Sequence, residues 1–344
     1  MYIQILIFMS TKRLPWIEKY RPASLSDVIS HANVIHTLNT FIKKGTLPNI
    51  ILFGPPGIGK TSIIKACAKK LYGDDVNLMT LEINASEERG IDIVRNTISH
   101  FASCVSTFTV HCENLSKLVI LDEADSMTYD AQIALKNVID VYSNVHFCLV
   151  CNCIKKIHYS LISRCIKLRL HPIRDSDIIT FTKNVCSKEN IKITDDAINE
   201  LVKYSNGDMR KIINALQSMR LSYQNITSTN IINYLNRISN EQLLTIIDTI
   251  CENNIRDAYK IVSDIINTNG YSIHEIIVGL NDLILQNIIN TSHTENKKSI
   301  IFEKYDERQL FDILYQLGKI EYQIFSNVPI STLMVSLICR CKLI

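Results

Sequence analysis

A glycine-rich run that ends in Lys60 and Thr61 carries the strongest chemical signal in the chain. Residues 54–61 read Gly-Pro-Pro-Gly-Ile-Gly-Lys-Thr and fit the phosphate-binding pattern G-x-x-x-x-G-K-[ST]. Glycines let the backbone wrap phosphates, and the amides that open the next helix supply donors and the positive end of its dipole. We expect Lys60 to reach the β- and γ-phosphates of ATP and Thr61 to ligate Mg²⁺. The residues expected to line the nucleotide are Gly54, Pro55, Pro56, Gly57, Ile58, Gly59, Lys60, Thr61 and Ser62.

A second signal lies where two carboxylates follow an apolar run. Residues 117–125 read Lys-Leu-Val-Ile-Leu-Asp-Glu-Ala-Asp. This pattern predicts Asp122 near the Mg²⁺ and Glu123 beside the γ-phosphate, where it polarises the attacking water. The alternative is an acidic loop that only caps the next helix. Because the motif follows the glycine-rich loop at a normal spacing for one domain, the pair favours a site that hydrolyses ATP.

Asn152 follows the next apolar run along the chain. An amide in this position can orient water or contact the γ-phosphate. An Asn at the end of a strand is also common turn chemistry. The residues alone leave both interpretations open.

Short apolar runs alternate with helical patterns between residues 49 and 170. The expected buried strands are 49–53, 78–83, 118–121, 145–151 and 166–170. Residues 61–71 have apolar side chains at helical spacing, and Gly73 suits a helix C-terminus. This alternation predicts a parallel sheet with helices on both faces. A chance Gly/Pro-rich turn would lack that context.

Helical patterns replace strand signals after Pro172. One helical group covers 175–189, 194–204 and 208–221, and a Thr-Asp-Asp cap opens its second helix. Another group runs from residue 241 to the C-terminus, with a polar loop near 290–298. The length of 344 residues is too great for one comfortable core. The sequence therefore predicts an α/β domain followed by all-helical parts.

The composition is that of a globular chain, with 47% hydrophobic and 21% charged residues. A net charge of only +3 means that any nucleic-acid surface must be a local patch. The 11 cysteines include a close group at Cys148, Cys151 and Cys153 but no second pair at zinc-finger spacing, so we expect buried free thiols. The apolar run 2–8 is too short to span a bilayer, and we expect no membrane segment.

Several ordered stretches go beyond general nucleotide chemistry. They are 14–22 (Leu-Pro-Trp-Ile-Glu-Lys-Tyr-Arg-Pro), 54–61, 84–92 (Asn-Ala-Ser-Glu-Glu-Arg-Gly-Ile-Asp), 121–127, 151–152, 163–165 (Ser-Arg-Cys) and 207–211 (Gly-Asp-Met-Arg-Lys). Together they resemble replication factor C small subunits of the AAA+ family, from about residue 14 to residue 217. Residues 29–31, 99–103 and 147–152 look most like the subunit 3/5 type.

The resemblance implies an α/β P-loop NTPase (AAA+) domain with a parallel sheet, then an all-α lid and an all-α collar. The expected boundaries are 1–13 for an N-terminal extension, 14–172 for the ATPase domain, 173–236 for the lid and 237–344 for the collar. It also implies ATP and Mg²⁺ as cofactors and a nuclear location. The expected partners are four other replication factor C subunits, the sliding clamp (proliferating cell nuclear antigen) and primer-template DNA.

We assign the family's functional roles to individual residues only where this sequence matches the family's motifs. Asn152 resembles the first sensor and Arg210 the second sensor, on the lid. Arg164 resembles the arginine finger that is donated in trans into the ATP site of a neighbouring subunit. Ile17 and Ile29 match positions that line the adenine pocket. Without the resemblance, Arg164 would be interpreted as an ordinary solvated charge.

The chain departs from the family pattern at residues 136–137, where Lys-Asn replaces a usual Arg-Arg pair; this argues against a DNA contact or a DNA-sensing role at those two positions. Ile58 replaces the Thr that is usual at this position of the loop. The side chain at this position is not a phosphate ligand, so we expect the site to keep its function. Four other basic residues are candidates to face DNA phosphates, with scattered surface charge as the alternative. They are Arg89, Arg95, Lys155 and Lys156.

Three other function classes are less consistent with the sequence. A helicase, which the letters Asp-Glu-Ala-Asp suggest, needs a second ATPase-like domain, whereas the chain turns helical after Pro172. A scaffold that binds ATP without hydrolysis predicts a damaged loop or no Glu123. An initiator or branch-migration ATPase would carry a C-terminal winged helix, and residues 241–344 show only helical periodicity.

Overall fold

The computed structural model describes residues 14–45, 47–87, 89–104, 116–236, 238–291, 307–324, 326 and 328–342. The chain forms two compact units, residues 1–228 and 229–344. The expected N-terminal extension lies outside the described residues.

A five-stranded sheet organises the first unit, with the strand order β2-β3-β4-β1-β5 and every pairing parallel. Its strands are β1 (Ile50–Phe53), β2 (Thr80–Asn84), β3 (Lys117–Asp122), β4 (Val145–Cys151) and β5 (Ile166–Arg169). The inner strands are buried nearly throughout, as expected where helices cover both faces of a parallel sheet. This confirms the predicted α/β class and its five strands, but the expected burial is wrong for β5, which lies at an edge of the sheet and is mostly exposed.

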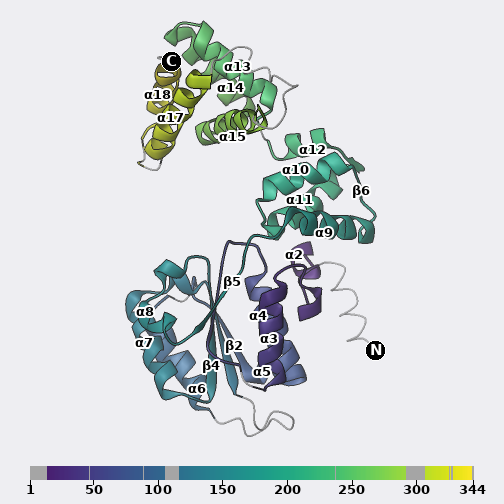
Figure 1. The fold of residues 1–344 in the computed structure, drawn as a ribbon, viewed down its shortest axis with the longest axis vertical. Helices are drawn as coiled ribbons and strands as arrows, with labels where there is room; N and C mark the ends of the chain where they lie inside the picture. The colour runs from purple at the N-terminus through teal and green to yellow at the C-terminus, as the bar shows by residue number, and fades with distance from the viewer. Residues whose placement is uncertain are drawn as a thin grey trace. The chain divides into compact units, whose positions relative to one another are not determined.

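Helices lie on both faces of this sheet (Figure 1). On one face are α3 (Ala32–Lys43) and α4 (Lys60–Tyr72); on the other are α6 (Ser99–Ser103), α7 (Tyr129–Val141) and α8 (Tyr159–Ile162). The predicted start of the second strand at residue 78 is wrong, because residues 76–79 form the short helix α5 (Val76–Met79) and Leu78 is 61% exposed.

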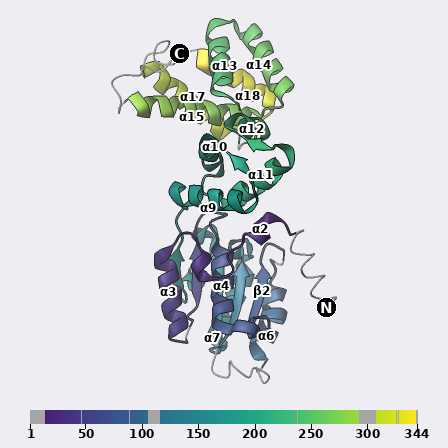
Figure 2. The same ribbon diagram turned by 90° about the vertical axis from the view of Figure 1, so that its right-hand side faces the viewer.

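A small helical subdomain completes the first unit (Figure 2). It contains α9 (Asp175–Lys188), α10 (Asp195–Ser205) and α11 (Met209–Ser222), and Thr194 caps α10 by accepting a hydrogen bond from the Ala197 amide. Two strands that the sequence did not predict, β6 (Lys192–Ile193) and β7 (Asn225–Ile226), pair in parallel here. Strands of two residues are too short to produce a period-2 pattern.

The segment before the sheet is fastened to this subdomain through one buried carboxylate. The short helix α2 (Trp16–Lys19) packs on α11, and the Trp16 amide donates to Gln217 Oε1 at 2.9 Å. Glu189, with its side chain 5% exposed, accepts hydrogen bonds from Lys19, Tyr20 and Arg220. Burial alone would raise the pKa of Glu189, but these donors and the two positive charges outweigh it and lower the pKa.

We expect Glu189→Gln to destabilise the first unit by about 1–2 kcal/mol at neutral pH, because three donors lose a buried, charged acceptor. The folded pKa lies below the ordinary value of 4.5, so this contribution is present above that value and is lost as the pH falls through the folded pKa. Trp16 is the chain's one tryptophan and lies beside Arg220, so its fluorescence can follow unfolding in denaturant. The difference between wild type and variant should shrink at acid pH. Glu200→Gln, in the exposed pair with Lys203, is the control; an equal loss in both variants would contradict the assignment.

The second unit consists of helices around its own apolar core. They are α13 (Asn240–Glu252), α14 (Ile255–Asn269), α15 (Ile273–Thr291), α17 (Glu307–Ile324) and α18 (Ile330–Lys342), after α12 (Ser228–Tyr234) at the start of the unit. Leu, Ile and Val side chains fill the centre, among them Ile246, Ile276 and Leu337, each fully buried. The predicted helical region is confirmed. The polar loop expected near 290–298 lies outside the described residues beyond Thr291.

No helix in the described ranges is long and apolar enough to cross a membrane.

The nine cysteines whose side chains the structure describes are free thiols. Five are buried: Cys67, Cys148, Cys151, Cys186 and Cys341. Burial raises the pKa of Cys186 to about 11, so the group stays a thiol at neutral pH. The expectation of buried thiols is wrong for Cys104, which is exposed.

Candidate nucleotide-binding site

The glycine-rich loop joins β1 to α4, and close packing dictates two of its glycines. A Cβ on Gly54 would lie 2.3 Å from the carbonyl oxygen of Leu170. Gly57 has φ +72°, and a Cβ there would overlap the carboxylate of Asp208. The Met209 amide also donates to the Gly57 carbonyl at 3.2 Å. The loop is therefore held between the sheet and the first turn of α11.

Lys60 begins α4 and is buried, with its ammonium directed at the loop and at β4. Its Nζ donates to Gly54 O at 2.9 Å, to Pro55 O at 2.7 Å and to Asn152 Oδ1 at 2.8 Å. Burial lowers the pKa of Lys60, and the negative charge of Asp122 acts in the opposite direction. The structure thus brings Asn152, one of the uncertain candidates, directly to the lysine of the loop.

Thr61 and Asp122 meet beside this lysine. The Thr61 hydroxyl donates to Asp122 Oδ2 at 2.7 Å, and Asp122 Oδ1 accepts from the Glu123 amide at 2.9 Å. A hydroxyl and a carboxylate suit Mg²⁺, which uses few protein oxygens and keeps waters and substrate phosphates as its other ligands. Nowhere in the described ranges do three or more His, Cys, Asp or Glu side chains form a group able to hold a metal ion. The Thr61 hydroxyl and the Asp122 carboxylate, which lie side by side, fit a nucleotide-bound Mg²⁺.

Glu123 follows β3 with a left-handed backbone, φ 51°. This conformation costs a non-glycine residue about 1–2 kcal/mol. The bond from its amide to Asp122 helps to hold it. Such strain often occurs where a side chain must be aimed at a site.

Two cavities adjoin at the loop. The smaller, of about 150 Å³, is lined by Pro56, Gly57 and Gly59 of the loop and by polar groups from α4, α11 and the ends of β3 and β4. Its polar lining residues are Lys60, Thr61, Asp122, Glu123, Asn152 and Arg210. These are the candidate phosphate, metal and sensor residues from the sequence analysis. The structure brings them together around one space.

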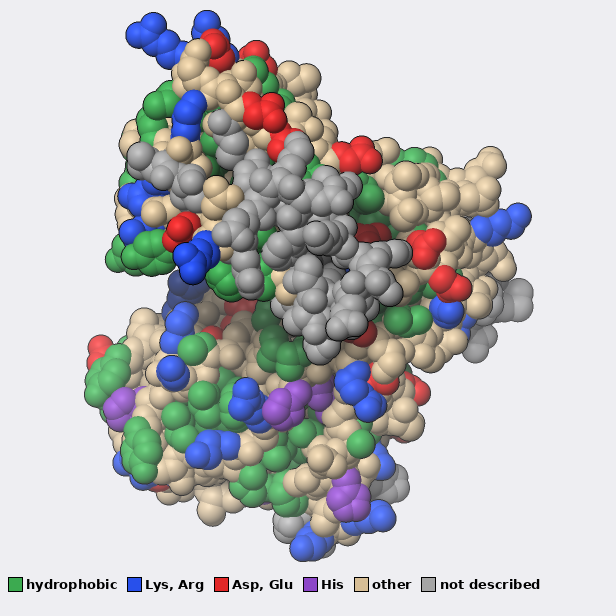
Figure 3. All heavy atoms as spheres, turned by 45° about the horizontal axis from the view of Figure 1, so that its top comes forward, with side chains coloured by type: hydrophobic (Ala, Val, Ile, Leu, Met, Phe, Trp, Pro, Cys, Tyr) green, Lys and Arg blue, Asp and Glu red, His purple; other side chains and the backbone are tan. Residues whose placement is uncertain are grey.

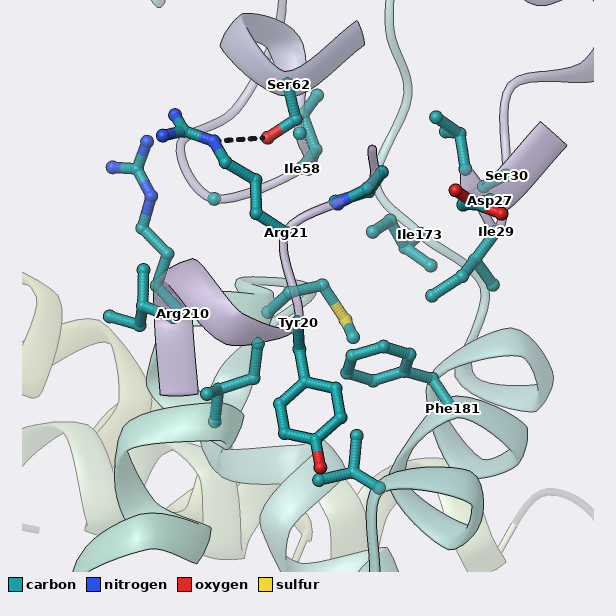
Figure 4. Close-up of a pocket in the computed structure, with 18 of the residues that line it drawn as sticks. Tyr20, Arg21, Asp27, Ile29, Ser30, Ile58, Ser62, Ile173, Phe181 and Arg210 are labelled. Atoms are coloured by element: carbon teal, nitrogen blue, oxygen red, sulfur yellow. Dashed lines mark hydrogen bonds between the residues drawn. The ribbon is translucent and has the colours of Figure 1, made fainter. Parts of the chain in front are cut away.

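The larger cavity, of about 680 Å³, has the size of a small-molecule site. It shares Gly57, Gly59, Thr61 and Arg210 with the smaller one, so the two cavities adjoin along the loop, and together they are called the cleft. Apolar side chains line much of it, including Ile17, Ile29, Ile58, Ile173 and Phe181. In Figure 4, Ile29 and Phe181 lie on one side, while Arg21 and Arg210 reach the side where Ser62 lies.

Arg21 is a lining residue that the sequence analysis missed. Its Nε donates to Ser62 Oγ at 3.2 Å, which joins the N-terminal segment to α4 (Figure 4). The signal was present, because Arg21 belongs to the Trp-Ile-Glu-Lys-Tyr-Arg-Pro stretch used for the family resemblance. By itself that stretch matches no nucleotide-binding motif, so its sequence does not indicate a contact with the glycine-rich loop. Its place beside the loop becomes evident only in the folded structure.

Arg164 lies apart from this set, because it lines neither cavity. It follows α8, and its side chain is paired with Asp140 on α7. Arg210, by contrast, stands at the start of α11, where Asp208 caps the helix by accepting from the Arg210 amide at 2.9 Å. Arg210 therefore faces this chain's own cleft and Arg164 does not.

The four candidate DNA residues are all exposed. Two of them are tied to the start of α7 through their backbone: Arg89 O accepts from the Thr128 amide at 3.1 Å, and Lys156 O accepts from Gln132 Nε2 at 3.2 Å. Arg95 lies on the π-helical segment Ile93–Ile98, and Lys155 lies in the turn Ile154–Lys156. On the face drawn in Figure 3, Lys and Arg side chains are scattered among apolar and neutral ones.

Comparison with known proteins agrees with this geometry. The model of the "ATPase family associated with various cellular activities (AAA)" matches residues 50–172, and that of the "RFC1-like, AAA+ ATPase lid domain" matches residues 177–233. The structure of the Thermotoga maritima RuvB Holliday junction branch migration motor superposes with a TM-score of 0.52, at 17% identity, over 71% of this chain and 85% of that chain. Fold and site together define an AAA+ ATPase.

Curated relatives narrow the class. Replication factor C subunit 5 of Mus musculus is 41% identical over 77% of this chain and 78% of its own length. Replication factor C subunit 3 of Schizosaccharomyces pombe is 38% identical over 78% of each. A putative replication factor C small subunit of Acanthamoeba polyphaga mimivirus is 36% identical over 88% of this chain. The chain therefore belongs to the replication factor C small subunits of the clamp loader, of the subunit 3/5 type.

Proposed function

We propose that this chain binds Mg²⁺-ATP and hydrolyses it as one subunit of a heteropentameric clamp loader in the nucleus. Four other replication factor C subunits complete the assembly, which opens the sliding clamp, proliferating cell nuclear antigen, and loads it onto primer-template DNA. The observation that carries the proposal is the convergence of Lys60, Thr61, Asp122, Glu123, Asn152 and Arg210 on one cavity.

The residues of the cleft divide the chemistry among themselves. Lys60 has three N–H donors, all directed at oxygens of the protein, and we infer that phosphate oxygens take over part of this coordination. Thr61 and Asp122 hold Mg²⁺, which neutralises charge on the phosphates when bound. Glu123 polarises the attacking water, and Asn152 positions it. Ile17 and Ile29 contact the base, and Arg210 senses the γ-phosphate from the lid.

We assign the parts of the chain accordingly. Residues 14–172 form the ATPase domain, 173–236 the lid and 237–344 the collar through which the subunits associate; residues 1–13 precede them. Arg164 acts outside its own cleft, as the finger that enters a neighbour's ATP site. Its exposure and its absence from both cavity linings support an action in trans.

Contacts to DNA go to the phosphate backbone through Arg89, Arg95, Lys155 and Lys156. We expect Arg89→Ala/Arg95→Ala to weaken binding of the assembled complex to primed DNA about equally for all base sequences. The slope of log K for DNA binding against log salt concentration should become less steep by about one to two. About one counterion is released from DNA for each phosphate contact, and the double variant loses up to two such contacts. Lys203→Ala, which removes an exposed cation on α10, is the matched control. An unchanged salt slope in the double variant would place the DNA path elsewhere.

Two rival functions are less well supported. The likeness to the branch-migration motor lies in the fold alone, at 17% identity. A scaffold that binds ATP without hydrolysis has no need of Glu123, which lines the phosphate cavity.

The proposal is tested by co-expressing this chain with four related subunits from the same source. A five-subunit complex should purify, and its ATP hydrolysis should rise when clamp and primed DNA are both added. If no complex forms, or if clamp and DNA leave its hydrolysis unchanged, the proposal is wrong.

A further inference from the structure

The side chain of Arg164 is held in a fixed orientation by α7. Its Nε donates to Asp140 Oδ1 at 2.6 Å and its Nη2 donates to Asp140 Oδ2 at 3.0 Å, a bidentate pair. Its Nη1 donates to the carbonyl oxygen of Ser160, in the preceding turn, at 2.8 Å. These bonds use three of the five N–H groups of the guanidinium. Two N–H groups remain for a ligand.

Asp140 is shared between two cations. Lys136 lies one turn earlier on α7, and its Nζ is 2.8 Å from Asp140 Oδ2. Hydrogen bonds from Arg164 and Lys136 lower the pKa of Asp140 to about 2, so the carboxylate stays ionised at neutral pH. The three side chains therefore carry one net positive charge.

We propose that Asp140 is a positioning residue for the arginine finger. It fixes the Arg164 guanidinium side-on, so that the two remaining N–H groups can donate to phosphate oxygens in the neighbouring subunit's site. The inference rests on the proposed role of Arg164 in trans.

Two effects of the carboxylate oppose each other. Its negative charge weakens the attraction of Arg164 for a phosphate, whereas its two hydrogen bonds remove the rotational freedom that a long side chain must lose on reaching a ligand. The side chains of Arg164 and Asp140 are 32% and 39% exposed, so solvent screens the charge term, and Lys136 offsets it further. Orientation is not screened, and donors that are already aligned need no reorganisation during the reaction. We therefore expect the positioning effect to dominate.

The test uses the five-subunit complex in which only the neighbour's ATP site is catalytically competent. Asp140→Ala should lower the neighbour's kcat about tenfold, as expected for a displaced catalytic group, and leave its ATP affinity within about twofold. Asp140→Glu, which keeps a carboxylate, should recover part of the loss. Asp130→Ala, which removes an exposed carboxylate from the first turn of the same helix, should change neither quantity. Thermal melting of each variant checks that α7 remains folded.

A double variant decides whether Asp140 acts through the arginine. Asp140→Ala/Arg164→Ala should be no slower than Arg164→Ala alone, because a positioning residue has nothing left to position. If the losses in the neighbour's kcat from the two single variants add up in the double variant, the inference is wrong. It is also wrong if Asp140→Ala raises the neighbour's kcat, because the carboxylate would then be keeping Arg164 away from the neighbour's site. If Arg164→Ala alone leaves the neighbour's turnover unchanged, the proposed role of Arg164 in trans is wrong. This result differs from one that rejects only the positioning role of Asp140.

Discussion

Arg164→Ala is expected to lower ATP turnover in the neighbouring subunit's site by about three to five orders of magnitude. This chain's own ATP affinity should stay within about twofold of wild type, because Arg164 does not line its cleft. The guanidinium stabilises charge that develops on the transferred phosphoryl group, and such donors act strongly where water is excluded. Arg164→Lys should restore little, because an ammonium lacks the planar fork of donors that matches phosphate oxygens.

The measurement is single-turnover hydrolysis in mixed complexes whose other ATP sites have been inactivated. Arg174→Ala provides the matched control, since Arg174 is another exposed arginine paired with an aspartate, Asp177, at 3.1 Å. Normal turnover in the neighbour of an Arg164→Ala subunit would reduce the Ser-Arg-Cys turn to an ordinary surface loop.

Glu123→Gln should abolish most hydrolysis in this chain's own site while preserving ATP binding. The substitution keeps the size of the side chain and the left-handed backbone at that position, and removes only the base that polarises water. General-base catalysis is worth about 10²–10⁴ in rate, so a fall within that range is expected. A loader stalled in this way should retain ATP and remain bound to the clamp.

Nucleotide retention and single-turnover rates in the same complexes measure this effect. Glu241→Gln, an exposed carboxylate in the first turn of α13, should leave both unchanged. Wild-type turnover in the Glu123→Gln complex would remove Glu123 from the mechanism.

The phosphate-site residues were predictable because each belongs to a local pattern. The glycine-rich loop needs backbone conformations and close approaches that few residues other than glycine permit, as the contacts at Gly54 and Gly57 show. Asp122 and Asn152 each stand at the carboxyl end of a buried apolar run, and such runs predict strands. Local patterns do not reveal strand order. The pairing of β4 with both β1 and β3 is what places Asn152 between the loop and Asp122.

The contacts that the sequence did not reveal join residues far apart in the chain. Arg21 and Ser62, Asp140 and Arg164, and Glu189 with its three donors depend on tertiary packing. From the sequence, Lys136 was interpreted only as part of the Lys-Asn dipeptide that replaces the family's Arg-Arg pair. In the fold its ammonium pairs with the Asp140 carboxylate. Charged side chains carry no periodic signal for such partners, because the same residues serve equally well on a solvated surface.

We propose that the cleft between the glycine-rich loop, β3, β4 and α11 hydrolyses ATP in the assembled loader. The most direct measurement is ATP turnover in a five-subunit complex in which only this chain retains its loop lysine. We expect turnover that rises when clamp and primed DNA are added and that disappears when Lys60→Ala is introduced as well. If turnover is absent from the first complex, or survives Lys60→Ala, this cleft is not the site of hydrolysis.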